Sequence, residues 1–356
     1  MKTTTISLNQ AKKTTSSEDL FFSDSLKHIV SSLSPRAQEI IFSRYGVFGS
    51  HPMTLEEIGK KYHITRERVR QIIREVLKKV REKKNDPIFL QIEEKVVLAL
   101  RANHGIMEEE KLLATLGKEN ANEKAAASFF LECIDSVIGS EIKDELKFSY
   151  TTKDFDIERW KNTKNATIEI LKEQKNPIRF DDLFEKVAEN QKESEFSKDS
   201  FAHHIEVSEE IRQNNFGKWG IVHWKEISPK GTREKAYLVL KESGEPLHFR
   251  DIAQKIDEFR LNKKKTHPQT VHNELIKDKN FVLIGRGIYA LVEWGYKKGT
   301  VKDVIEEILK KSERLLSREE IIAKVLEVRN VKKSTIVINL NNYFSKSKNG
   351  TYSIKK

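Results

Sequence analysis

The sequence is poor in cysteine and has no long apolar run. A single cysteine, Cys133, stands among its 356 residues, which excludes an intrachain disulfide and a multi-cysteine zinc site. Its apolar neighbours favour a buried thiol. No apolar segment reaches the roughly 18 to 20 residues that a membrane-spanning helix needs. The first 20 residues are polar and lack the apolar segment of a signal peptide. We therefore expect a soluble, cytoplasmic protein without membrane contacts.

Signatures of catalysis are also missing. The sequence contains no Ser/His/Asp arrangement, no cluster of metal ligands and no Walker loop. His203 and His204 lack nearby cysteine or carboxylate ligands, so we do not expect zinc there. Gly285-Arg286-Gly287 lacks the third glycine of a dinucleotide fingerprint, and we interpret it as a tight turn between two strands instead of a phosphate loop. The expectation is a protein that is not an enzyme and needs no cofactor, metal or small-molecule substrate.

The charge balance is strongly basic. Lys and Arg outnumber Asp and Glu by 65 to 54, for a net charge of +11 and an isoelectric point near 9.3. A basic protein gains affinity for polyanions because binding releases their counterions. Charge alone does not distinguish nucleic acid from an anionic membrane surface.

Length and periodicity predict several small domains. A chain of 356 residues is long enough for about two to four domains of ordinary size. Residues 1–22 show little hydrophobic periodicity and are predicted to form a flexible arm. Between Leu26 and Lys84 apolar residues recur at helical spacing, and Asn85-Asp86-Pro87 ends the last helix. These signals predict a helical domain over residues 23–86.

Beyond Pro87 one pattern recurs along the chain. In the clearest copy a helix over 233–242 precedes a second helix opened by 246–253, a third opened by 266–271, and a strand pair around Gly285-Arg286-Gly287. Three helices followed by a hairpin are typical of a winged helix. The pattern recurs at 301–356, more loosely at 166–224, and most weakly at 91–157.

The chain is therefore predicted to be mainly α with small β-hairpins. An N-terminal helix-turn-helix domain is followed by tandem winged-helix-like domains. The predicted winged-helix-like domains are 161–228, 229–298 and 299–356. Residues 88–160 are predicted to form an acidic unit that is either helical or winged-helix-like, so the pattern indicates three or four winged-helix-like domains.

Residues 54–84 carry the most informative motif, TLEEIGKKYHITRERVRQIIREVLKKVREKK. Thr54 and Glu57 predict a capping box at the start of a short helix. Gly59 indicates a close approach of two helices, and Thr65 is predicted to cap the next helix. Apolar residues of that next helix fall on one face, whereas arginine and glutamine fall elsewhere. The predicted buried residues are Val69, Ile72, Ile73, Val76 and Leu77.

The charge of this segment points to DNA. Residues 60–84 include eleven basic and three acidic residues, a density that repels itself unless phosphates neutralise it. Arginine and glutamine near a helix N-terminus are typical of a recognition helix in the major groove. The alternative is a solvated basic helix of a bundle.

This motif, with Leu33-Ser34-Pro35-Arg36 and Arg44-Tyr45-Gly46 before it, resembles region four of primary bacterial sigma factors. That region binds the promoter −35 element and the flap of the RNA polymerase beta subunit. The resemblance implies base contacts by Arg66, Glu67 and Gln71. It implies phosphate contacts by Thr65, Arg68 and Arg70, and Arg74 on the exposed side completes the predicted DNA-binding set. Residues 34–45 would face the flap, and the predicted polymerase contacts are Arg36, Ile40, Ile41 and Arg44.

One departure from the sigma pattern limits the expected function. Sigma factors melt the −10 element with an aromatic-rich helical domain that precedes region four, and here only about 30 residues precede it. We expect that this protein does not open a promoter by itself.

Residues 247–253, 270–275 and 281–296 resemble a HARE-type winged helix. That family includes the N-terminal domain of the RNA polymerase delta subunit and modules attached to chromatin proteins and restriction enzymes. The resemblance implies DNA binding or coupling to the transcription machinery. Lys263, Lys264, Lys265 and Arg286 are candidate secondary contacts with the DNA backbone, or else ordinary surface charges.

Charge separates the remaining predicted domains. Residues 92–150 include twelve acidic and seven basic residues, which favours a spacer or a protein contact, because phosphate would repel this unit. Residues 325–356 include seven basic residues and one acidic residue, which suits a second DNA contact.

The leading hypothesis is a sigma-like transcription factor of the bacterial cytoplasm, associated with the nucleoid. Its expected partners are double-stranded DNA and the RNA polymerase core. An alternative is an interaction protein that competes with the sigma factor for the polymerase flap without specific DNA binding. A third hypothesis is a specificity subunit of a restriction or defence system.

Overall fold

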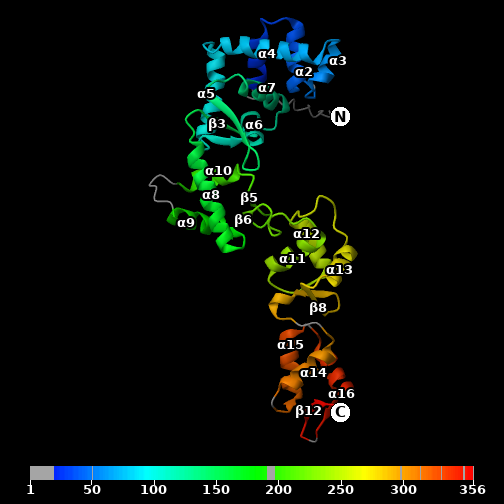
Figure 1. The fold of residues 1–356 in the computed structure, drawn as a ribbon. Coiled ribbons are helices and arrows are strands. Elements are labelled where there is room, and N and C mark those ends of the chain that lie inside the picture. Colours follow the sequence, from blue (N-terminus) through cyan, green and yellow to red (C-terminus); the bar gives the residue numbers. More distant parts are fainter. Residues whose placement is uncertain are drawn as a thin grey trace, which may run out of the picture. The chain divides into compact units, whose positions relative to one another are not determined.

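The computed structural model describes residues 20–49, 51–190, 197–296, 299–312, 314–329, 331–347 and 349–355. Residues 1–19 of the predicted flexible arm, 1–22, lie outside the described residues. The last two residues of the predicted arm, Phe21 and Phe22, begin the first helix. The described chain is mainly helical with four small antiparallel sheets, which confirms the predicted fold class (Figure 1). None of the described helices has the length and hydropathy that crossing a bilayer requires.

Four helices open the structure. They are α1 (Phe21–Val30), α2 (Pro35–Tyr45), α3 (Leu55–Tyr62) and α4 (Arg66–Glu82). Ser34 caps α2, and Pro35 occupies its first position, where no backbone N–H is needed. Gly46 ends α2 with a positive φ of 77°, a conformation that favours glycine.

The same order of elements then occurs four times: a helix, a short strand, two helices and a two-stranded hairpin. The first copy is α5 (Pro87–Arg101), β1 (Ile106–Glu108), α6 (Glu109–Gly117), α7 (Ala121–Leu131), β2 (Val137–Ile142) and β3 (Leu146–Thr152). The second is α8 (Ile157–Gln174), β4 (Ile178–Arg179), α9 (Phe180–Asn190), α10 (Lys198–Glu206), β5 (Ile211–Gln213) and β6 (Lys218–Ile221). The sequence pattern left three or four copies open, and the structure contains four, including the weakest.

The third copy is α11 (Thr232–Ser243), β7 (Leu247–His248), α12 (Phe249–Glu258), α13 (Pro268–Lys277), β8 (Phe281–Gly285) and β9 (Ile288–Leu291), followed by the short helix η2 (Val292–Trp294). The fourth is α14 (Val301–Lys311), β10 (Leu316–Ser317), α15 (Arg318–Val328), α16 (Lys333–Tyr343), β11 (Phe344–Lys346) and β12 (Thr351–Ile354). In every sheet the last strand lies in the centre and pairs antiparallel with the other two.

The short first strand of each copy is absent from the sequence-based prediction. The sequence pattern places Leu247 and His248 at the start of a helix, but they form β7 and pair with Tyr289 and Ile288 of β9. A strand of two residues is too short to display the alternation that identifies strands, and its partner comes much later in the chain. The helix begins only at Phe249.

The hydrophobic cores do not follow all of the predicted domain boundaries. Residues of the four N-terminal helices and of the first winged helix share one core, which extends from Phe22 to Tyr150. Tyr45 of α2 packs edge to face against Phe129 of α7, with ring centroids 5.2 Å apart, and Cys133 is buried beside α7 as expected. The segments 23–86 and 88–160, predicted as separate domains, therefore pack as one body.

The described chain forms two compact units. One reaches to Glu169 and includes Phe184–Glu210, and the other consists of Ile170–Leu183 and the chain from Ile211 onward. The predicted domain 161–228 is thus divided between the two. Within the second unit, the third and fourth winged helices each have a core of their own.

Candidate nucleic-acid interface

Helix α3 and the turn after it set the position of α4. The Thr54 hydroxyl accepts a hydrogen bond from the Glu57 N–H, and the Glu57 carboxylate accepts one from the Thr54 N–H at 2.7 Å, which forms the predicted capping box. A Cβ on Gly59 would lie 2.7 Å from the Ile64 carbonyl oxygen. Glycine at this position therefore allows the turn to fold tightly against α3.

Helix α4 presents one apolar and one polar face. The Thr65 hydroxyl accepts a hydrogen bond from the Arg68 N–H at 3.1 Å and caps the helix. The buried residues recur at helical spacing, and they are Val69, Ile73, Val76 and Val80. Ile72 and Leu77 are partly buried against the same core. The predicted apolar face is confirmed.

The opposite face of α4 is open to solvent. The residues predicted to bind DNA are all exposed, and they are Thr65, Arg66, Glu67, Arg68, Arg70, Gln71 and Arg74. Figure 1 shows α4 running across the end of its unit, next to α2 and α3. The N-terminal turn that a recognition helix inserts into a groove is therefore uncovered by the described residues.

Neighbouring side chains on this face hold one another in place. Arg70 donates two hydrogen bonds to the Glu67 carboxylate, at 2.8 and 2.5 Å. Arg68 donates one to the side-chain amide oxygen of Gln71 at 3.2 Å. The hydrogen bonds from Arg70 hold the pKa of Glu67 below its usual range, so this carboxylate stays charged. Arg66 and Arg74 have no hydrogen-bonded or ion-paired partner in the described part of the chain.

This arrangement suits contacts with base edges. A guanidinium binds the O6 and N7 acceptors of guanine with two hydrogen bonds, and a glutamine amide binds the N6 and N7 of adenine in the same way. Arg66 and Gln71 supply these two groups on the first turns of α4. The i, i+3 pairs with Arg70 and Arg68 are exposed, so they cost little to exchange for contacts with DNA.

Some basic residues of the motif bind other parts of the protein instead. Arg81 donates a 2.6 Å hydrogen bond to the Glu132 carbonyl, and the Lys83 ammonium donates one of 2.7 Å to the Ile29 carbonyl. Lys60 forms an ion pair with Glu56 at 2.9 Å. Protein carbonyls and carboxylates thus match part of the positive charge of this segment, which its composition alone attributes to phosphate contacts.

The predicted polymerase-facing helix α2 needs one correction. Ile40 and Ile41 are fully buried, with 0% of their surface exposed, and cannot contact a partner in this fold. Helical spacing turns them toward the shared core, where α2 packs against α4 and α7. Arg36 and Arg44 are exposed and donate hydrogen bonds to the carbonyls of Tyr62 and Met53, at 2.7 and 3.2 Å.

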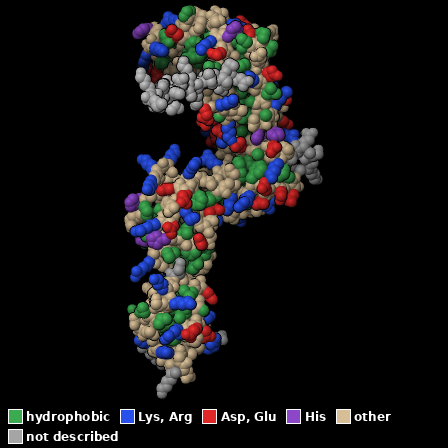
Figure 2. Space-filling view, turned by 180° about the vertical axis from the view of Figure 1, so that it is seen from behind, with side chains coloured by type: hydrophobic (Ala, Val, Ile, Leu, Met, Phe, Trp, Pro, Cys, Tyr) green, Lys and Arg blue, Asp and Glu red, His purple; other side chains and the backbone are tan. Residues whose placement is uncertain are grey.

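The candidate secondary contacts lie on two elements of the third winged helix. Lys263, Lys264 and Lys265 are exposed in the loop before α13, and Arg286 is exposed at the tip of the β8–β9 hairpin. Gly287 follows with a φ of 72°, and a Cβ there would lie 2.5 Å from His248 Nε2. The predicted tight turn is confirmed. Figure 2 shows Lys and Arg side chains projecting from this part of the molecule. A DNA-binding role for these four residues stays a prediction.

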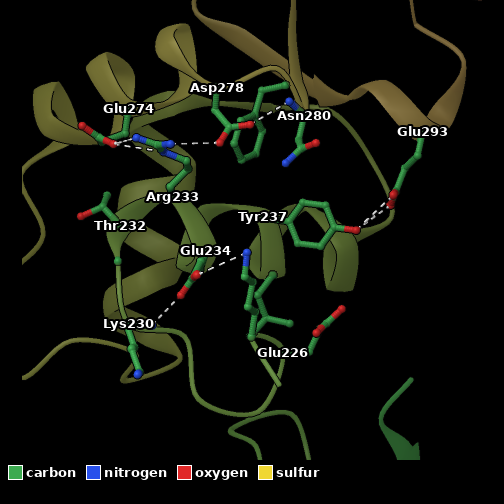
Figure 3. Close-up of a pocket in the computed structure, with 14 residues that line it drawn as sticks. Glu226, Lys230, Thr232, Arg233, Glu234, Tyr237, Glu274, Asp278, Asn280 and Glu293 are labelled. Atoms are coloured by element: carbon green, nitrogen blue, oxygen red, sulfur yellow. Dashed lines mark hydrogen bonds and ion pairs between the residues drawn. The ribbon is translucent and has the colours of Figure 1, made fainter. Parts of the chain in front are cut away.

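A cavity of about 540 Å³ lies in the same unit, beside α11. Its charged groups largely pair with one another (Figure 3): Arg233 forms ion pairs with Glu274 and Asp278, at 2.9 and 3.3 Å. The Tyr237 hydroxyl donates to the Glu293 carboxylate, and burial together with this carboxylate raises the pKa of Tyr237 to about 12. Because the charges are matched internally, the cavity offers weaker evidence for a site than the open face of α4.

His203 and His204 lie on α10. The Nδ1 atoms of both are buried without a hydrogen-bond partner in the described part of the chain, and the ring of His203 packs against that of His104. Within the described residues, no group of three His, Cys, Asp or Glu side chains is arranged to hold a metal ion.

A helix-turn-helix with an exposed arginine- and glutamine-bearing face, followed by four winged helices, defines a class of DNA-binding proteins. Two known families match the chain. Residues 29–82 match Sigma-70, region 4, and residues 232–294 match HARE-HTH, the HTH domain found in ASXL proteins and restriction endonucleases. The chain thus contains a sigma region 4 domain and a HARE-HTH domain, which together indicate a DNA-binding protein related to transcription.

Curated relatives match only the N-terminal part. RNA polymerase sigma factor SigA1 of Synechococcus elongatus is 40% identical over 66 residues, or 18% of this chain and 16% of that protein. RNA polymerase sigma-C factor of a Nostoc species is 41% identical over 59 residues, 17% of this chain and 14% of the relative. SigA of Clostridium acetobutylicum is 40% identical over 58 residues, with shares of 16% and 15%. The chain therefore spans only about a sixth of the length of these relatives.

Proposed function

We propose that the protein is a sigma-like transcription factor that binds a −35-type promoter duplex through the N-terminal turns of α4. Arg66, Glu67 and Gln71 contact base edges, while Thr65, Arg68, Arg70 and Arg74 contact phosphates. The observation that carries the proposal is the exposure of Arg66 and Gln71 on a helix whose other face is anchored in a core. No catalytic step is part of this function.

The proposal includes the RNA polymerase core as a partner. The exposed side of α2, with Arg36 and Arg44, is the proposed contact with the beta flap. The likeness of residues 29–82 to sigma region 4 supports this contact.

Duplex binding by full-length variants tests the proposed function. Arg66→Ala and Gln71→Ala should each weaken binding to the preferred duplex by about 1–3 kcal/mol, or about 5- to 150-fold, and relax base preference at one position. Lys79→Ala, an exposed change near the other end of α4, serves as the control and should leave base preference unchanged. Binding is measured by fluorescence anisotropy on duplexes that differ at single positions.

Two results would contradict the proposal. An equal loss of affinity for all sequences would mean that α4 contacts phosphates alone. Capture of polymerase that survives Gln71→Ala, with no duplex binding at physiological salt, would instead support the interaction protein that competes for the flap.

A further inference from the structure

The third helix of each winged helix corresponds to the recognition helix of a helix-turn-helix. These third helices are α7, α10, α13 and α16. The four copies share a topology, so the surroundings of these helices decide which copy has a groove-binding face available. The first and the last copies differ most clearly.

Helix α7 is already used by the protein itself. The carboxylate of Glu123, in its first turn, accepts hydrogen bonds from the N–H groups of Phe22 and Ser23 at 2.7 and 2.8 Å. Asn122, one residue earlier, accepts one from the Phe48 N–H at 2.7 Å. Figure 1 shows α7 lying beside the N-terminal helices. The residues that would meet base edges are therefore engaged, and this copy serves as a support for the N-terminal helices.

Helix α16 has an uncovered face of suitable composition. Ile336 and Leu340 point into the core of the fourth winged helix. The exposed residues on the other side of the helix are Ser334, Thr335, Ile338, Asn341 and Asn342. Ile338 lies in the middle of this stripe with 57% of its surface exposed. Hydroxyl groups, amides and one apolar side chain suit contacts with base edges, because asparagine forms hydrogen bonds with adenine and apolar groups contact the thymine methyl.

The charge around this stripe is positive. From residue 328 to the end the sequence contains seven Lys and Arg and no Asp or Glu. Lys332 and Lys333 stand at the start of α16, and Lys346 and Lys355 lie on and just after the hairpin strands; all four are exposed. Buried Arg329 is excluded from this surface, because it donates hydrogen bonds to the carbonyls of Leu283 and Gly299.

The acidic residues that the structure describes in the fourth winged helix lie on α14 and α15, and most of them are engaged. Asp303 and Glu320 complete the capping boxes of α14 and α15. Glu306 and Glu307 form ion pairs with Lys310 and Lys311, at 2.7 and 2.9 Å. These carboxylates therefore do not pair with the lysines beside the α16 stripe.

We infer that the fourth winged helix is a second binding site for duplex DNA, which places α16 in the major groove and Lys332, Lys333 and the hairpin lysines against phosphates. The site lies outside both family matches, which cover residues 29–82 and 232–294, and it does not depend on α4. It extends the protein's footprint beyond the −35-type element. DNA is the occupant because the surface combines groups that bind base edges with groups that bind phosphates.

A matched pair of charge variants in the full-length chain tests this inference. Lys332→Ala/Lys333→Ala removes two charges beside the stripe, and Lys310→Ala/Lys311→Ala removes two from the ion-paired side of α14. Anisotropy titrations of a long duplex over a range of salt give the slope of log K against log salt. The first variant should reduce the slope by about 1.8 and weaken binding about tenfold at physiological salt, because two phosphate contacts are lost. The second should leave both values unchanged. Equal effects of the two variants, or none from the first, would overturn the inference.

A second pair tests the stripe without altering lysines. Ile338→Glu places a carboxylate in the centre of the α16 face and should weaken duplex binding at least about tenfold. Leu326→Glu, at an exposed apolar position of α15, should change binding less than about twofold. If both bind DNA like the parent chain, the α16 surface is not a DNA site, as would be the case if it bound an acidic protein.

The same titrations in an Arg66→Ala/Gln71→Ala background separate this inference from the proposed function. A further loss from Lys332→Ala/Lys333→Ala in that background supports an α16 site of its own. If the α4 changes have no effect on base preference but the α16 changes weaken binding, the proposed function fails and this inference stands. If only the α4 changes matter, the inference fails.

Discussion

At the scale of single residues, Glu123 shows how a distant side chain completes a helix. The first backbone N–H groups of a helix lack partners inside the helix. Glu123 is only 3% exposed, and its two carboxylate oxygens accept hydrogen bonds from the N–H groups of Phe22 and Ser23 at the start of α1. A negative charge at this end also matches the helix dipole. The carboxylate therefore joins α1 to α7.

Glu123→Gln should destabilise the first unit by about 1–3 kcal/mol, since an amide offers one acceptor oxygen and turns an N–H₂ group toward a buried N–H. Glu119→Gln, an exposed change just before the same helix, is the control and should alter stability by less than about 0.5 kcal/mol. Urea denaturation of the full-length chain measures the difference. Equal free energies of unfolding for the two variants would show that Glu123 is not a structural cap.

Local residue roles were more predictable than distant ones. The capping box of Thr54 and Glu57 and the need for Gly59 follow from neighbours in the sequence, and the structure contains both. Glu123 was counted only as part of an acidic segment, because its partners lie 100 residues away. No local pattern identifies such a partner.

At the scale of elements, α10 carries a histidine that opposes folding at low pH. His204 is 6% exposed; its ring packs against Phe155, and its Nδ1 atom has no hydrogen-bond partner in the described part of the chain. Burial, followed by the positive charge of Arg159, lowers the pKa of His204 to about 4. The folded state thus favours the neutral ring.

This pKa shift predicts a pH-dependent loss of stability. The unfolded chain binds a proton at His204 below about pH 6.5, whereas the folded chain does so only near pH 4, so stability falls as the pH drops through this window. The contribution reaches roughly 3 kcal/mol at its acidic end. His204→Phe should flatten the dependence, and His223→Phe, at an exposed position, should not. Denaturation curves between pH 7 and about pH 4 measure both. A parent-like slope in His204→Phe would contradict the prediction.

Elements with strong periodicity were predicted well, and short elements were not. The apolar face of α4 follows from the 3.6-residue repeat of Val69, Ile73 and Val76. The same repeat placed Ile40 and Ile41 on a helix, but the resemblance to a sigma region assigned them to a partner surface, and their burial corrects this. The strand of Leu247 and His248 is too short to show a repeat of any kind.

At the scale of the whole molecule, one recurring topology serves different purposes. The repeated pattern in the sequence predicts three or four winged helices, and the structure shows that the acidic copy over 91–157 is the fourth. It did not predict that α7 of that copy packs into a core shared with the N-terminal helices. Packing between domains depends on surface shape and on single buried groups such as Glu123, which composition does not express.

This packing explains how α4 is held. Arg81 bonds the carbonyl of Glu132 after α7, and Lys83 bonds that of Ile29 at the end of α1. The C-terminal half of α4 is thus anchored on both sides, while its first turns remain open. A recognition helix fixed in this way needs little reorganisation when it meets DNA.

Methylation of a bound −35-type duplex by dimethyl sulfate tests the central claim, because guanine N7 is accessible only in the major groove. The full-length chain should protect at least one guanine N7 within the site, and Arg66→Ala should restore its methylation while hydroxyl-radical protection of the flanking sugars persists. If every guanine in the occupied duplex is methylated as in free DNA, α4 does not enter the major groove.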